Sequence, residues 1–246
     1  MAPIPTALSP ALPSELLTYV LSHQAFPTTV IICQPRQAFL SSLLRSIDDP
    51  PAVQLPEPSR TDTPVSRSAH VPEQSEKHPL LIPTLRQVAA SRYINLVFID
   101  TVTHLRAYLA AFPPPETENE PLEQKFDRPR GDEPLLLVYG LLALHRDTSE
   151  WSAQGLGNSV AALVEAGWRT KRRILLLEER SNSGTRPGDG GDEAQKVWEE
   201  QLPMLNGSVR RAGLEAEGGG WSGRTVEVGK ILQRWFKIEK GDWDDK

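Results

Sequence analysis

Four short, continuously apolar runs separated by segments of helical periodicity dominate the hydrophobic pattern of the chain. Strands buried on both faces have this pattern, as in a parallel sheet covered by helices. The runs are "TTVIICQ" (28–34), "INLVFID" (94–100), "PLLLVYGLLAL" (134–144) and "RRILLLEE" (172–179). We therefore expect strands at about 28–33, 94–99, 135–140 and 173–178.

The segments beside these runs place apolar residues at i, i+3, i+4 and i+7, which is the spacing of one helix face. This spacing predicts helices at 14–24, 37–47, 102–112 and 152–168. Gly167 is expected to cap the last of them. Strand and helix alternate four times, which is typical of an α/β domain with right-handed crossovers.

Three polar stretches interrupt the pattern, at 48–79, 113–133 and 181–193. Each has too little apolar surface to offset the entropy of ordering it, so we expect flexible loops inserted into a single domain that spans residues 1–246. In the C-terminal third, "LPMLNGSVRR" and "GRTVEVGKILQRWFKI" alternate well enough to be strands. They predict a hairpin at one edge of the sheet.

Composition and charge narrow the classes of function. The net charge of −5 argues against a generally basic nucleic-acid-binding protein, although a local basic patch is compatible with it. One cysteine in 246 residues excludes an internal disulfide framework. No apolar run approaches the ~18 residues that a membrane span needs. We expect a soluble intracellular protein.

The turn between the first apolar run and the next helix is where many nucleotide-binding proteins have a glycine-rich phosphate loop. Such a loop works through converging backbone N–H groups, a lysine and a Ser/Thr hydroxyl. Here Pro35 has no N–H, while Ala38 and Phe39 stand where lysine and threonine would be expected. The turn itself reads Cys33, Gln34, Pro35 and Arg36, with no glycine. The sequence therefore predicts that nucleotide is not hydrolysed here.

Other catalytic patterns are absent from the sequence. The five histidines, at 23, 70, 78, 104 and 145, have no metal-ligand spacing. Cys33 ends a buried strand, and no His/Asn motif accompanies it as a nucleophile would require. We expect no metal, no cofactor and no enzymatic activity.

The segment 134–180 resembles the core of the RecA-like recombinase family. In that family a strand ending in a magnesium-organising aspartate leads to a DNA-facing loop. Here "LLLVYGLLALHR" (135–146) follows the family's register, including Ala143, Leu144 and Arg146. Tyr139 stands in place of the aspartate, and a tyrosine cannot organise a magnesium–water shell as a carboxylate does. The resemblance implies a RecA-like three-layer fold that has lost both nucleotide motifs.

By this resemblance the chain is similar to the small subunits of the Shu complex. It implies a non-catalytic subunit of a nuclear DNA recombination and repair accessory complex, which binds another RecA-like paralog and DNA and supports recombinase filaments. Two alternatives stay open. One is a cytoplasmic RecA-like subunit of the Elongator subcomplex, acting in tRNA modification. The other is a small α/β enzyme of unrecognised chemistry.

Basic and aromatic side chains are the candidates for binding DNA and the partner. Backbone contacts to nucleic acid need only charge and reach. The DNA candidates are Arg146, Arg169, Lys171, Arg172, Arg173, Arg180 and Arg186. The partner candidates are Trp221, Trp235, Phe236 and Trp243, since tryptophan is enriched at interface hot spots. Two alternatives are structural: basic residues after a helix complement its dipole, and Trp235 and Phe236 cap the core.

Overall fold

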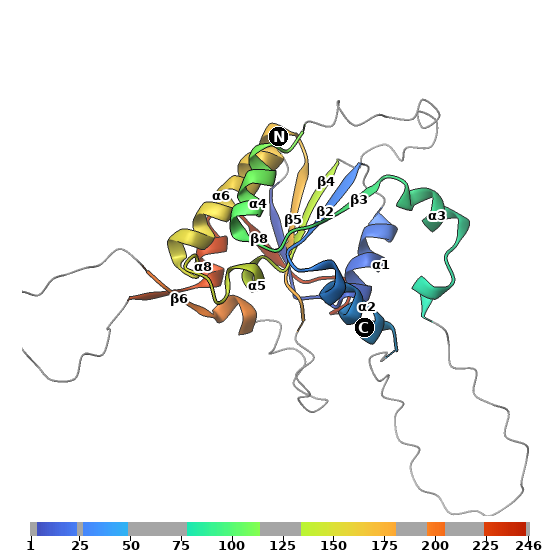
Figure 1. Ribbon diagram of the computed structural model, residues 1–246, viewed down its shortest axis with the longest axis horizontal. Coiled ribbons are helices and arrows are strands. Elements are labelled where there is room, and N and C mark those ends of the chain that lie inside the picture. Colours follow the sequence, from blue (N-terminus) through green and yellow to red (C-terminus); the bar gives the residue numbers. More distant parts are fainter. Residues whose placement is uncertain are drawn as a thin grey trace, which may run out of the picture.

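Six parallel strands form the central sheet, with helices on both of its faces (Figure 1). The computed structural model describes residues 4–23, 27–48, 78–113, 134–180, 196–204 and 224–244. In spatial order the strands are β3 (Ile94–Phe98), β2 (Thr28–Ile32), β4 (Leu135–Tyr139), β5 (Arg173–Leu177), β1 (Thr6–Leu8) and β8 (Lys237–Glu239). The predicted α/β class with a mainly parallel sheet is confirmed, and so are all four predicted strands.

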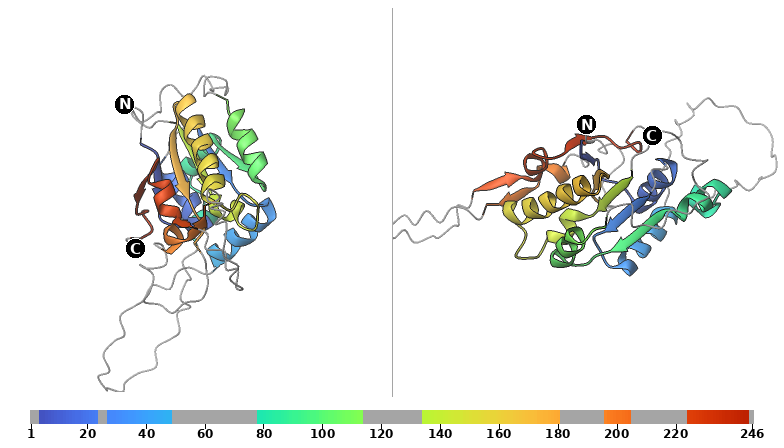
Figure 2. Two further views of the ribbon diagram at one scale, coloured as in Figure 1. Left: turned by 90° about the vertical axis from the view of Figure 1, so that its left-hand side faces the viewer. Right: turned by 90° about the horizontal axis from the view of Figure 1, so that it is seen from above.

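The sheet lies between two groups of helices, as the views from the side and from above show (Figure 2). On one face, α1 (Pro13–His23) and α2 (Arg36–Asp48) pack against alternate residues of the central strands, and α3 (Leu85–Ser91) contacts α1. The opposite face is covered by α4 (Val102–Ala110), α6 (Ala153–Arg169) and α8 (Val228–Leu232). The four predicted helices therefore form, with their ends shifted by a few residues.

The alternation of strand residues explains how one apolar run serves both faces. In β2, Val30 and Ile32 belong to the core under α1 and α2, whereas Ile31 belongs to the core under α4 and α6. Val30, Ile31 and Ile32 are fully buried. Continuous hydrophobicity is therefore required here.

The predicted strand run at 134–144 divides into a strand and a short helix. Gly140 has a φ of +81°, a conformation that glycine adopts without strain. This residue turns the chain from β4 into α5 (Leu141–His145). At the end of α6, Gly167 stays inside the helix, and Lys171 takes the left-handed conformation with a φ of 52°. Gly167 is thus not the cap that the sequence predicted. An added Cβ there would lie 2.4 Å from a carbon of Ile174, so close packing explains the glycine.

The C-terminal hairpin exists, but its predicted place at the edge of the main sheet is wrong. β6 (Gln201–Pro203) and β7 (Thr225–Glu227) pair antiparallel in a two-stranded sheet of their own. The edge is instead β8, which runs parallel to β1. Part of the predicted second strand is α8, because Val228, Ile231 and Leu232 have the i, i+3, i+4 spacing of a helix and are buried.

Most of the predicted loops lie outside the described residues. The segment before α3 contains a 3₁₀ turn, η1 (Pro79–Leu81), where the predicted loop 48–79 ends. Within the described part of the chain, no helix has the length and apolar character needed to cross a membrane.

Candidate functional site

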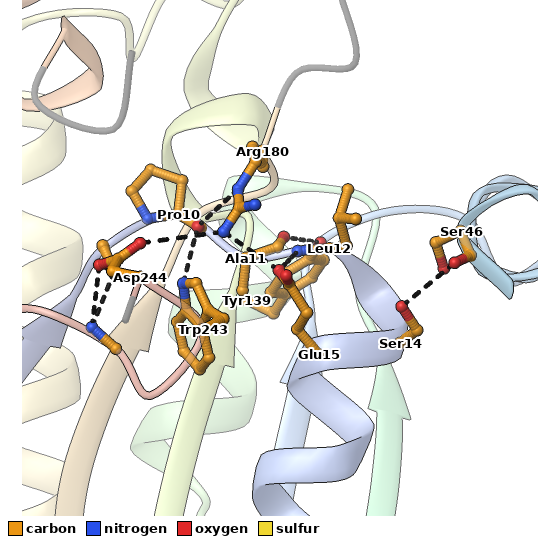
Figure 3. Close-up of polar contacts among 12 residues, drawn as sticks. Pro10, Ala11, Leu12, Ser14, Glu15, Ser46, Tyr139, Arg180, Trp243 and Asp244 are labelled. Atoms are coloured by element: carbon orange, nitrogen blue, oxygen red, sulfur yellow. Dashed lines mark hydrogen bonds and ion pairs between the residues drawn. The ribbon is translucent and has the colours of Figure 1, made fainter. Parts of the chain in front are cut away.

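Tyr139 lies at the carboxyl ends of the parallel strands, the edge at which open α/β sheets bind ligands. It is the last residue of β4 and is fully buried. Its hydroxyl donates a hydrogen bond of 2.9 Å to the backbone oxygen of Ala11, in the loop after β1 (Figure 3). Its ring packs edge-on against Phe39 at the start of α2, with 6.1 Å between the ring centroids. Tyr139 therefore connects the two strand–turn–helix junctions, after β1 and after β2.

The loop after β1, residues 9–12, is a second strand–turn–helix junction, which sequence reasoning missed. Its strand has only three residues and lies between two prolines, so it gives no periodic signal. The N–H of Ser9 donates to Glu239 O, that of Ala11 to Glu178 O, and that of Leu12 to a carboxylate oxygen of Glu15. Pro10 has no N–H. Since a phosphate loop needs converging free N–H groups, this loop cannot act as one.

Residues 241–244 are held against the same loop by hydrogen bonds and ion pairs. The indole N–H of Trp243 donates to the backbone oxygen of Pro10 at 3.1 Å (Figure 3). The Nε of Arg180 donates to the same oxygen at 3.3 Å. The Arg180 guanidinium also lies 3.3 Å from Glu15 and 3.9 Å from Asp244. The side chain of Arg180 and the segment 241–244, which contains Trp243, thus cover the carboxyl end of β1.

The turn after β2 contains the predicted remnant of the phosphate loop. The structure brings Cys33, Phe39 and Tyr139 together there: the N–H of Cys33 donates to Tyr139 O, and Phe39 is buried between Tyr139 and Phe98. Burial raises the pKa of the Cys33 thiol well above its usual range, so it is not a reactive thiolate. Gln34 is half-buried, and the remaining residues of the set, Pro35, Arg36 and Ala38, are exposed.

Glu178, at the end of β5, is a functional-looking carboxyl that sequence reasoning did not single out. It is 3% exposed, and it accepts a hydrogen bond of 2.9 Å from the N–H of Leu142 at the start of α5. Burial raises the pKa of Glu178 to about 8, although hydrogen bonds from the backbone of α5 act to lower it. The carboxyl is therefore mostly neutral at pH 7. The described residues contain no group of three His, Cys, Asp or Glu side chains that could hold a metal ion.

His145 and Ser159 have the contacts of a serine–histidine pair, another arrangement that their sequence separation concealed. His145 Nδ1 lies 2.8 Å from Leu141 O, and Nε2 lies 2.9 Å from Ser159 Oγ. Because a carbonyl only accepts, Nδ1 carries the hydrogen and Nε2 accepts from the serine hydroxyl. Ser159 in turn accepts from Arg106 Nε at 3.0 Å. His145 and Ser159 are both fully buried, so no substrate reaches them and the network holds α4, α5 and α6 together.

Two of the predicted DNA-binding arginines are held by acidic side chains near the carboxyl edge of the sheet. Arg146 forms an ion pair of 2.6 Å with Glu200 and lies over the ring of Trp151. Arg180 is bound to Glu15 and Asp244, as described above. Side-chain charge at these positions is therefore largely neutralised within the chain.

Arg172 is the predicted DNA contact that the structure contradicts. The residue is 2% exposed, and its Nη1 donates to Pro27 O at 3.1 Å and to Thr29 Oγ1 at 3.3 Å. Its guanidinium lies 5.0 Å from the centre of the Phe112 ring. The residues of the basic cluster were predicted to contact DNA, but the chain turns this one arginine inward just before β5.

The other basic residues of that cluster have separate roles. Arg169 donates at 2.9 Å to Phe112 O and Leu109 O, and so satisfies the carboxyl end of α4. Lys171 is exposed, and Arg173 is half-buried in the first position of β5. The five residues of β5 separate Lys171 from Arg180 by roughly 15 Å. The structure therefore does not bring the predicted basic residues into one surface, and Arg186 lies outside the described residues.

The aromatic partner candidates are mostly core residues. Phe236 is 4% exposed and Trp243 is 8% exposed, so neither presents a free surface. Trp235 is 44% exposed and fits the prediction of an accessible aromatic side chain. Trp221 lies outside the described residues. The interface predicted for Phe236 and Trp243 is thus corrected to packing against the core.

Comparison with known proteins adds only a weak resemblance of fold. No family model matches the chain, and no curated protein matches it. Among solved structures the chain is similar to a DnaB-like replicative helicase, described with its interactions with primase, at 9% sequence identity and a TM-score of 0.35. The match covers 73% of this chain and 39% of the helicase chain, so the chain spans about two fifths of that protein. This is a weak similarity to a RecA-like helicase fold.

Proposed function

We propose that the chain is a RecA-like subunit without ATPase activity, which binds a RecA-like paralog and DNA in a recombination and repair accessory complex. The observation that carries the absence of ATPase activity is the filled carboxyl edge of the sheet at the loop after β1. Each N–H of residues 9–12 has a partner within the chain, and Tyr139 occupies the space between the two junctions. Nucleotide binding there would require breaking the chain's own contacts with Tyr139, Arg180 and Trp243.

A subunit that does not turn over nucleotide acts through surfaces. Trp168 is 74% exposed at the end of α6, and the exposed Lys171 follows it in the turn before β5. Stacking of a base on an aromatic side chain, beside a cation for the phosphate, is the usual way to bind single strands without reading sequence. With a net charge of −5 the chain would bind DNA weakly, and a partner subunit would share the contact. In this role the complex would support a recombinase filament without consuming ATP.

Calorimetry with Mg-ATP at millimolar concentration tests the first half of the proposal. We expect no saturable heat and no phosphate release from the purified chain. Saturable binding of Mg-ATP would contradict the proposal, and its loss in an Arg36→Ala variant would place the nucleotide at the turn after β2.

Binding of labelled oligonucleotides by the complex with its co-purifying partner tests the second half. The double variant Trp168→Ala/Lys171→Glu should weaken binding to single-stranded DNA at least several-fold. Each lost phosphate contact should reduce the slope of log K against log salt by about 0.7. Lys230→Glu makes the same charge change at another exposed position and should bind as the wild type does. A large preference for tRNA over single-stranded DNA would favour the Elongator-like alternative instead.

A further inference from the structure

The two edges of the central sheet differ in how they are protected against pairing with another strand. An exposed edge strand is a template for further pairing, and proteins blunt it with short length, charge or proline. β8, at one edge, has three residues, of which Lys237 and Glu239 are charged. β3, at the other edge, has five residues, "INLVF", with no charge and no proline. Among the described residues, no strand pairs with the outer side of β3.

The backbone of β3 presents its outward groups at alternate residues. Thr28 N donates to Tyr93 O, and Ile99 N donates to Ile32 O, so odd-numbered residues of this segment face β2. Because successive backbone groups of a strand point to opposite sides, the N–H and C=O of Ile94, Leu96 and Phe98 point away from the sheet. Leu96 at the centre is 42% exposed, which is unusual for a leucine in the middle of a strand.

We propose that β3 pairs antiparallel with β3 of a second copy of this chain, with the two-fold axis at Leu96. In this register Leu96 faces Leu96 of the other copy, and Ile94 faces Phe98. All of these residues have outward N–H and C=O groups, so each facing pair exchanges two hydrogen bonds. The two sheets would then form one continuous sheet across an isologous interface.

Charge complementarity selects a second copy rather than an unrelated strand. Arg92 precedes β3 and Asp100 follows it, both exposed, and they lie four residues on either side of Leu96. Arg92 is the C-cap of α3 and has helical dihedral angles, so it does not continue the strand, but two-fold antiparallel pairing still brings the Arg92 end of each β3 to the Asp100 end of the other. A parallel arrangement in register would instead place like charges together, which is destabilising.

Apolar side chains near this edge add area to the interface. Leu85 and Val88 of α3, the helix that leads into β3, are 90% and 46% exposed. α2 packs on β3 through Phe39 and Phe98, and its Leu40 and Leu44, one turn apart, are 42% and 61% exposed. Leu96 lies on the same face of the sheet as α2, together with Ile94 and Phe98. This dimer is independent of the proposed function, since neither the filled edge nor Trp168 takes part in it.

Sedimentation equilibrium of the full chain, from about 1 to 200 μM, measures the dimer. Arg92→Asp and Asp100→Arg should each raise the dissociation constant about tenfold, because each places two like-charged pairs across the axis. The combined variant exchanges the charges and should return the constant to within about threefold of wild type. Lys237→Asp and Glu239→Arg reverse the same charges on β8, the opposite edge, and should leave the dimer unchanged. A monomer at 200 μM, or a combined variant no better than the single ones, would overturn the proposal.

Leu96→Pro separates pairing from folding. The N–H of Leu96 points outward, so proline there removes no hydrogen bond to β2 and is acceptable on an edge strand. The variant should keep the wild-type circular dichroism spectrum and remain monomeric. In the wild type, hydrogen exchange of the Ile94, Leu96 and Phe98 amides should slow as concentration rises, whereas Asn95 and Val97 should be protected at every concentration. A dimer that persists in folded Leu96→Pro would show that a different surface is used.

Discussion

The phenol oxygen of Tyr139 lies 2.9 Å from the backbone oxygen of Ala11, so the carboxyl end of β4 is joined to the loop after β1. The same residue stands where the recombinase resemblance places a metal-organising aspartate. In the proposed function, this one side chain would replace the ligand for magnesium and also close the loop after β1 against a phosphate.

Tyr139→Phe should lower the free energy of unfolding by about 0.5–1.5 kcal/mol. The variant keeps the ring packed against Phe39 and removes one of two hydrogen bonds to Ala11 O, which still accepts from the N–H of Arg180 at 3.1 Å, so the cost is that of one ordinary hydrogen bond. Urea denaturation followed by tryptophan fluorescence measures the difference. If the midpoint does not move, the hydroxyl does not contribute to closing the loop.

Gly241→Ala should release the C-terminal segment. A Cβ at this position would lie 2.3 Å from two carbons of the Trp243 ring, so the indole must move and lose its hydrogen bond to Pro10 O. We expect a red shift in fluorescence and a loss of about 1–3 kcal/mol of stability. Gly157→Ala is the matched control, because nothing lies within 4 Å of a Cβ there; it should be neutral or stabilising by up to about 1 kcal/mol. Equal effects of the two variants would contradict this account.

The strands and helices that could be predicted from the sequence are those with strong periodicity. β2, β3, β4 and β5 are five-residue apolar runs, and the helices between them have a clear apolar face. β1 and β8 have three residues each, too few for a periodic pattern, and only pairing makes them strands, of β1 with β5 and of β8 with β1. In α8 a helical spacing was hidden inside a segment that also alternates, and burial of Val228 against the core decides the outcome.

The candidate site was predicted in part. Sequence reasoning placed Tyr139 beside Phe39 and Cys33, and the structure brings these three together. It did not find Ala11, Arg180–Glu15 or Trp243–Pro10, because those contacts join residues far apart in the chain. A run of basic residues also does not show which of them turns inward, since burial depends on the neighbouring strand as well as on the residue type.

Stability should depend on pH through Glu178. Its pKa is about 8 in the folded protein against 4.5 when exposed, so between these values the folded state binds more protons than the unfolded state. By linkage its contribution to the free energy of unfolding is greatest below pH 4.5 and falls as pH rises toward 8, by the order of a few kcal/mol. Glu178→Gln keeps an acceptor for the Leu142 N–H but does not titrate. Its free energy of unfolding should therefore increase relative to that of the wild type as pH rises from 6 to 8.5. Urea midpoints at both pH values measure this gain, and parallel pH dependence would show that Glu178 ionises freely.

Charge reversal of Arg172 should act on folding, whereas the same change at Lys171 should not. Arg172 is buried against Phe112 and donates to Pro27 O, so a glutamate there would leave an uncompensated buried charge and two acceptors without their donor. Breaking a buried charged group in this way costs about 3–5 kcal/mol. Lys171 is exposed in the adjoining turn, and Lys171→Glu should change the free energy of unfolding by less than about 0.5 kcal/mol. Thermal unfolding of the two variants separates these effects before any DNA is added. If Arg172→Glu unfolds like the wild type but loses DNA binding, Arg172 is a surface contact after all, and its buried position is wrong.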